Sequence, residues 1–230
     1  HGFVIELMAK TTDEIIAVNS GSAPNIAFGR LTPDNVTGNS VTQWHGGNNL
    51  YFWDRAYEYI LRINTFLEKM EEVTITLDNK DVLVAEARFL RGWIYFNMIE
   101  RFGDVPLVTE TYELGSDHTF TSTPFDQVVA FIETEFAAIM PTLPKYYSSA
   151  DSNFGRPTQA ICQAILSRMH LYAASPLFNP NNDKAKWEKA YKSSKTFIDT
   201  YTEYALYNNY EAMFSEPSGT ANSEIIYART

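Results

Sequence analysis

Aromatic, amide and charged side chains gather in a polar stretch between residues 28 and 45. A flat ring can cover the apolar C–H face of a sugar, while amide, carboxylate and guanidinium groups hydrogen-bond its hydroxyls. The surrounding residues 19–50 are rich in Asn, Ser, Gly, Thr and Pro and show no sustained period. A loop of this length is usually functional or disordered, and its aromatic residues argue against full disorder. The side chains of interest are Phe28, Arg30, Asp34, Asn39 and Trp44.

Recognisable catalytic motifs are missing from the sequence. It contains no Walker loop, dinucleotide glycine pattern, His-Glu-x-x-His, paired-cysteine metal site or Gly-x-Ser-x-Gly elbow. Two facing carboxylates could hydrolyse a glycosidic bond, but spacing selects no pair among 28 acidic residues. Glu86 and Glu100 are interpreted as solvent-facing or paired with arginine, and Asp104 as a turn residue. We therefore expect no catalytic residue and no cofactor.

Metal binding is also not expected. None of the four histidines has another at the i,i+4 spacing of a helical metal site. The segments 151–153 and 181–183 carry oxygen ligands but lack the complete spaced set of a calcium loop, so we interpret them as turns.

Composition and charge narrow the class of protein. The 230 residues carry a net charge of −10, which repels phosphate backbones and argues against nucleic acid as a partner. No run approaches the roughly 20 apolar residues of a membrane-spanning helix. The one cysteine, Cys162, lies in an apolar run and is interpreted as a buried, inert thiol. Because the sequence starts without Met or a signal peptide, we interpret it as a processed or excised piece.

Hydrophobic periodicity predicts a series of helices. The clearest covers residues 85–102, where Gly103 suits the left-handed position that closes a helix and Pro106 prevents its continuation. This helix is apolar around much of its circumference and should pack on more than one side. Three further long helices are predicted at 49–72, 124–141 and 158–174.

Local sequence signals predict the start of the helix at 124–141 and the positions of the shorter elements. Ser122 and Thr123 offer a cap ahead of Pro124 at the first helical position. Short elements are expected as helices at 13–18 and 206–214 and as a strand at 223–227. A fifth long helix at 184–201 has an apolar side that we expect to face inward, formed by Trp187, Ala190, Tyr191, Ser194, Phe197 and Ile198.

An internal repeat predicts how the helices stack. Ala87, Arg91 and Tyr95 recur as Ala164, Arg168 and Tyr172, in each case at steps of four. Such residues form one line on a helix. We therefore predict a mostly α fold of tetratricopeptide-like stacked helical hairpins, an α/α superhelix with long irregular loops and a few short strands. The whole chain, 1–230, is expected to be one domain with a loop-rich segment (1–50) and a helical-repeat scaffold (51–230).

One part of the chain resembles a known family. The strings Ala87-Arg88-Phe89-Leu90-Arg91-Gly92 and Arg101-Phe102-Gly103-Asp104-Val105-Pro106-Leu107 look like the signature of the SusD/RagB family, outer-membrane lipoproteins that capture glycans beside a TonB-dependent transporter. Blocks at 155–158, 171–174, 210–214 and 222–226 are similar to the family in the same order. The resemblance covers about residues 52–230, and we expect the C-terminal part of the family to be absent from this sequence.

The resemblance implies a function. It implies non-enzymatic binding of an oligosaccharide or polysaccharide at the bacterial outer-membrane surface, with delivery to a SusC-like TonB-dependent transporter. Family glycan contacts come chiefly from variable loops, which selects Trp44 and also Arg30, Asp34, Asn39 and Phe28 as glycan-binding residues. A lipid anchor, which this chain does not show, is inferred from kinship alone. An α-helical glycoside hydrolase and a protein-interaction scaffold without sugar binding stay open as alternatives.

Overall fold

The structure is a computed structural model that divides into two compact units, His1–Glu58 and Tyr59–Thr230. The predicted helix at 13–18 lies outside the described residues, and the single domain over 1–230 stays a prediction. The structure describes residues 53–74, 79–112, 115, 119–148, 151–215 and 223–227.

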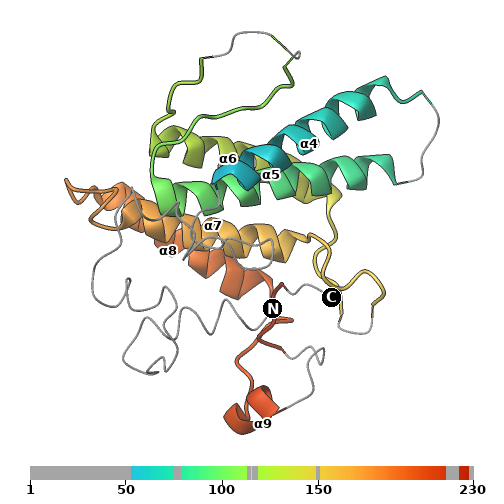
Figure 1. The fold of residues 1–230 in the computed structure, drawn as a ribbon. Helices are drawn as coiled ribbons and strands as arrows, with labels where there is room; N and C mark the ends of the chain where they lie inside the picture. Colours follow the sequence, from blue (N-terminus) through green and yellow to red (C-terminus); the bar gives the residue numbers. More distant parts are fainter. Residues whose placement is uncertain are drawn as a thin grey trace, which may run out of the picture. The chain divides into compact units, whose positions relative to one another are not determined.

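Within those residues the chain is mostly helical, which confirms the predicted fold class, and the five long helices stand where periodicity predicts them (Figure 1). None of the helices in the described ranges is both long and apolar enough to cross a bilayer. The helices are α4 (Trp53–Glu72), α5 (Lys80–Phe102), α6 (Phe125–Ile139), α7 (Gln159–Ala174), α8 (Lys184–Thr200) and α9 (Tyr210–Ser215), with a 3-10 turn, η1 (Met140–Thr142).

Helix α5 packs on more than one side, as its apolar circumference predicts. It lies along α6 and also contacts α7, and its Phe89, Tyr95 and Ile99 are fully buried. Gly92 allows the close approach to α6, because a Cβ at this position would lie 2.5 Å from Cε1 of Phe136. The helix therefore forms the core on which its neighbours pack.

The end of α5 depends on a glycine and an aspartate. Gly103 has φ 69° and ψ −117°, a region that glycine adopts without steric cost, and its N–H donates to the carbonyl of Ile99 at 3.1 Å. The carboxylate of Asp104 accepts the N–H of Phe125 at 2.8 Å, at the positive end of α6. The predicted cap from Ser122 or Thr123 is wrong: α6 begins one residue after Pro124, with no side-chain cap from its own N-cap residue.

Helix α8 packs on α7 through small side chains. Ala190 and Ser193 are buried, and Gln163 of α7 donates to the carbonyl of Ser193 at 2.8 Å. Trp187 and Tyr191, predicted to face inward with Ile198, are instead 41% and 64% exposed. Ile198 is also exposed. The inward side is rotated toward the small residues because they let the two helix backbones approach closely.

The two copies of the sequence repeat have different environments. Arg91 is buried, whereas the side chain of Arg168 is 60% exposed and lies 3.6 Å from Glu100. Tyr95 is buried, and the ring of Tyr172 packs edge-on against Phe96. The repeat therefore marks the same residue spacing on α5 and α7 but not similar interactions.

The predicted strand at 223–227 is wrong. This segment forms turns and bends, and the carbonyl of Ser223 accepts from the N–H of Ala205 at 3.0 Å. Glu224 uses its carboxylate to accept the N–H of Tyr207 at 2.7 Å. In the described ranges, the one β-bridge pairs Val105 with Thr123. The apolar residues of 223–227 suited a strand, but the described chain provides no neighbouring strand for a ladder.

Candidate functional site

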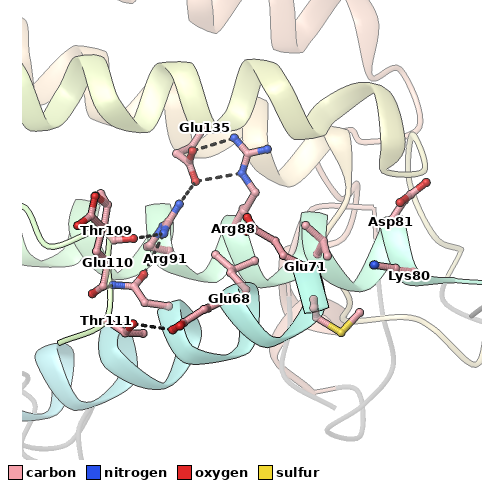
Figure 2. Close-up of a pocket in the computed structure, with 14 residues that line it drawn as sticks. Glu68, Glu71, Lys80, Asp81, Arg88, Arg91, Thr109, Glu110, Thr111 and Glu135 are labelled. Atoms are coloured by element: carbon pink, nitrogen blue, oxygen red, sulfur yellow. Dashed lines mark hydrogen bonds and ion pairs between the residues drawn. The ribbon is translucent and has the colours of Figure 1, made fainter. Parts of the chain in front are cut away.

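A groove of about 730 Å³ lies between α4, α5 and the segment at 109–111 (Figure 2). Glu135 of α6 lies at its base, between Arg88 and Arg91 of α5. Leu67, Met70 and Val84 supply its apolar surface. All of these residues belong to the Tyr59–Thr230 unit.

An ion-pair cluster closes the base of the groove. Glu135 accepts from Arg88 at 2.8 and 3.2 Å and from Nη2 of Arg91 at 2.8 Å. Burial raises the pKa of Glu135, but the hydrogen bonds from Arg88 and Arg91 outweigh burial and hold the pKa below its ordinary value. The carboxylate is therefore a stable anion that neutralises part of the arginine charge.

Arg91 connects three parts of the chain. Its Nη1 donates to the side-chain oxygen of Asn64 at 2.9 Å and to the carbonyl of Thr109 at 3.3 Å. Its guanidinium lies over the ring of Phe131, with 5.5 Å from Cζ to the ring centre. The buried Nε has no hydrogen-bond partner. This arginine fixes the wall of the groove and leaves one donor unused.

The 108–110 segment is held by side chains of α4 and α5. The hydroxyl of Tyr95 donates to the carbonyl of Val108 at 2.9 Å and accepts its N–H at 2.7 Å. Asn64 donates to the carbonyls of Val108 and Glu110 at 3.2 and 3.0 Å. Burial raises the pKa of Tyr95 to about 12, so the phenol stays protonated.

The rim of the groove is acidic. Glu68, Glu71, Asp81 and Glu110 are exposed carboxylates on it. Glu68 accepts from the hydroxyl of Thr111 at 2.5 Å, whereas the other three carboxylates make no hydrogen bond or ion pair with the described residues. The amine of Lys80 donates to the carbonyl of Val73 at 3.3 Å.

The base of this groove does not suit acid–base hydrolysis. A glycosidase needs one carboxylic acid that is protonated near neutral pH, through a raised pKa. The pKa of Glu135 is shifted the other way. Across the described ranges no group of three or more His, Cys, Asp or Glu side chains could hold a metal ion.

The loop residues selected from the sequence lie outside the described residues. This applies to all five: Phe28, Arg30, Asp34, Asn39 and Trp44. Their assignment as glycan-binding residues stays a prediction.

Other acidic residues singled out from the sequence have structural partners. Glu86 forms a two-bonded ion pair with Arg156 at 2.8 and 2.7 Å. Glu100 pairs with Arg101 at 2.7 Å. Both were interpreted as solvent-facing or paired with arginine, and the structure confirms the second alternative. Asp104 lies in the turn after α5, as interpreted, and also stabilises the start of α6.

The turn and cysteine interpretations agree with the structure. The carboxylate of Asp151 accepts the N–H of Asn153 at 2.8 Å within a turn. Asn182 has a positive φ and accepts from the indole of Trp187. Cys162 is buried, and burial raises the pKa of its thiol to about 12. Such a thiol has little reactive thiolate near neutral pH.

Sequence reasoning missed the groove as a unit. Arg88 and Arg91 were singled out as part of the family signature, and their bonds to Glu135 now give them a structural role. Glu135 had no local signal, because it lies 44 residues from Arg91 in the chain. The signal that was available for the groove is the charged stretch from Glu68 to Glu72, where acidic residues gather at the end of the predicted helix 49–72.

Comparison with known families decides what kind of protein this is. A SusD-like family model, described as starch-binding and associating with the outer membrane, matches residues 11–171. The chain belongs to the SusD-like family. This confirms the resemblance found in the α5 signature.

SusD-like relatives of known structure share the fold. A laminarin-binding SusD-like protein is 26% identical, with a TM-score of 0.64, over 77% of this chain and 37% of its own. Surface glycan-binding protein A from Bacteroides uniformis is 28% identical, with a TM-score of 0.61, over 77% of this chain and 37% of its own.

A curated SusD-like protein, P25 from Formosa agariphila, is 20% identical over 177 residues, which are 76% of this chain and 31% of that protein. The chain thus spans about a third of the length of these relatives.

Proposed function

We propose that this SusD-like chain takes part in binding a glycan at the surface of the bacterial outer membrane. The observation that carries the proposal is the family match over residues 11–171, because that family is described as starch-binding and outer-membrane associated. The relatives described as binding laminarin and surface glycans support the same ligand class. The glycan itself is an oligosaccharide or polysaccharide.

The proposed mechanism is capture followed by delivery. Loop side chains hold the sugar by ring stacking and hydrogen bonds, and the glycan then passes to a SusC-like TonB-dependent transporter. Trp44 supplies the ring, with Arg30, Asp34, Asn39 and Phe28 around it. Attachment to the membrane through a lipid anchor is part of the proposal and rests on family membership.

A glycan array followed by calorimetry tests the binding proposal. Wild type, Trp44→Ala and Trp187→Ala are compared, since Trp187 is an exposed tryptophan on α8 and gives a matched control. We expect saturable binding that is lost in Trp44→Ala and kept in Trp187→Ala, with helical content by circular dichroism unchanged. Equal binding by all three proteins would contradict the assignment of Trp44 to the glycan site. Absence of binding by the folded chain would contradict glycan binding by this chain.

Catalysis is the alternative that needs its own test. We propose a binding protein rather than a hydrolase, which the lowered pKa of Glu135 supports for the groove. Any oligosaccharide that binds is incubated with the protein and its products are separated by chromatography. Unchanged saccharide is expected. Shortened products, lost again on mutation of a carboxylate, would make the chain a glycoside hydrolase instead.

A further inference from the structure

The groove of Figure 2 carries more negative than positive groups. Carboxylates outnumber basic side chains five to three among its lining residues. The two arginines lie at the base, where they share the carboxylate of Glu135, so Lys80 is the one basic side chain among the four exposed carboxylates of the rim in the described lining. The exposed carboxylates therefore set the sign of the potential at the rim.

Glu71 is placed where a negative charge is unfavourable. It lies in the last turn of α4, at the negative end of the helix dipole. The nearby cation of that turn, Lys69, is paired with Glu72 at 2.9 Å. Glu71 makes no ion pair among the described residues, so a cation that entered the groove would relieve this repulsion.

The walls favour an alkyl chain over a sugar ring. No aromatic side chain lines this groove in the described structure, so no flat ring is available for stacking. Leu67, Met70 and Val84 offer aliphatic surface below the carboxylates. A lysine or arginine places its methylene groups on such a surface and its charged end among carboxylates.

The base of the groove keeps a positive charge as well, because two arginines share the one carboxylate of Glu135. Arg88 is the more accessible of the two, since its side chain is 29% exposed and that of Arg91 is 9% exposed. A polypeptide brings both kinds of group, since its backbone carbonyl oxygens accept hydrogen bonds and its basic side chains are cations. A free amine would bring the cation alone.

From these observations the geometry points to a docking site for a basic polypeptide segment of a partner protein, in the groove between α4 and α5. Lysine or arginine side chains of that segment bind Glu71, Asp81 and Glu110, and its backbone carbonyls run toward Arg88. This interaction is independent of glycan binding, and it assigns to the α4–α5 hairpin a partner that is recognised through charge complementarity.

Fluorescence anisotropy of the full chain with a fluorescein-labelled hexalysine peptide tests the site. We compare wild type with Glu71→Gln/Asp81→Asn and with a control, Glu188→Gln/Glu211→Gln, which removes the same charge from exposed positions on α8 and α9. The dissociation constant should rise about five-fold in the groove variant and by less than about two-fold in the control, because binding becomes weaker. The same peptide with acetylated lysines should not bind.

Competitors distinguish the other occupants. If spermine displaces the peptide with equal affinity, a free cation is enough to fill the groove. If maltoheptaose binds to wild type but not to the groove variant, the groove is a sugar site. Either result overturns the proposal, as does equal weakening in groove variant and control or absence of peptide binding. Glu110→Gln, in the loop, gives a second variant if the first shows a lower urea midpoint.

Discussion

Arg91 of α5 and Glu135 of α6 form an ion pair of 2.8 Å in which each side chain is 9% exposed. Arg88 shares the same carboxylate. Burying charges carries a large desolvation cost, which the pair offsets only while both partners are present. The stability of the α5–α6 contact therefore depends on keeping this pair intact.

Removal of the shared carboxylate should destabilise the fold strongly. Glu135→Gln leaves Arg91 buried without an anion, so we expect the free energy of unfolding to fall by about 3 kcal/mol. Urea denaturation followed by circular dichroism measures the change. The control is Asp199→Asn, which removes the exposed Lys195–Asp199 pair and should cost less than about 0.5 kcal/mol. Similar losses in the two variants would contradict this role for Glu135.

The same carboxylate should make stability depend on pH. Because the folded-state pKa of Glu135 lies below its ordinary value of 4.5, its stabilisation is present above that value and is lost as pH falls through the folded-state pKa. The difference in unfolding free energy between wild type and Glu135→Gln should be constant from about pH 5.5 to 7 and shrink below pH 4.5. Urea titrations at several pH values measure it. Parallel pH profiles for the two proteins would count against the lowered pKa.

Loss of one hydroxyl should loosen the 108–110 segment. Tyr95→Phe removes the group that binds both the N–H and the carbonyl of Val108, and leaves the buried N–H unpaired. We expect a loss of about 2 kcal/mol in unfolding free energy. Amide hydrogen exchange at Val108 should also become faster. The comparison is Tyr191→Phe, at a side chain that is 64% exposed, and an equal loss there would rule out this explanation.

A methyl group on Gly92 should push α5 and α6 apart. Alanine favours a helix over glycine by about 1 kcal/mol, but a Cβ only 2.5 Å from Phe136 adds an overpacking cost of about 1–3 kcal/mol. The net loss in Gly92→Ala should be about 1 kcal/mol. Thermal and urea unfolding of Gly92→Ala, Phe136→Leu and the double variant test the contact. The double variant should lose at least about 0.5 kcal/mol less than the summed single losses, and strict additivity would exclude the clash.

Local signals made the helices predictable. Gly103 and Pro106 mark the end of α5 because their backbone restrictions act within a few residues. On α8 the inward position predicted for Ala190 is confirmed, whereas Trp187, Tyr191 and Ile198 are exposed. These three also follow helical spacing, and only the partner helix selects which side of α8 is buried.

Long-range contacts could not be predicted in the same way. The bonds from Asp104 to Phe125 and from Arg91 to Glu135 join residues 21 and 44 positions apart. A single sequence does not show which carboxylate meets which partner across such separations. The groove follows from these pairings, so it could be recognised only once α4, α5 and α6 were placed.

The hold on residues 108–110 has a consequence for how relatives of this chain can diverge. Tyr95, Asn64 and Arg91 bind this segment through its peptide groups alone, at the N–H of Val108 and the carbonyls of Val108, Thr109 and Glu110. Every amino acid has the same carbonyl, so the side chains at 109 and 110 are free to change while the path of the chain is kept. Relatives can therefore carry different side chains at positions 109 and 110 without a change in the helices that hold the segment.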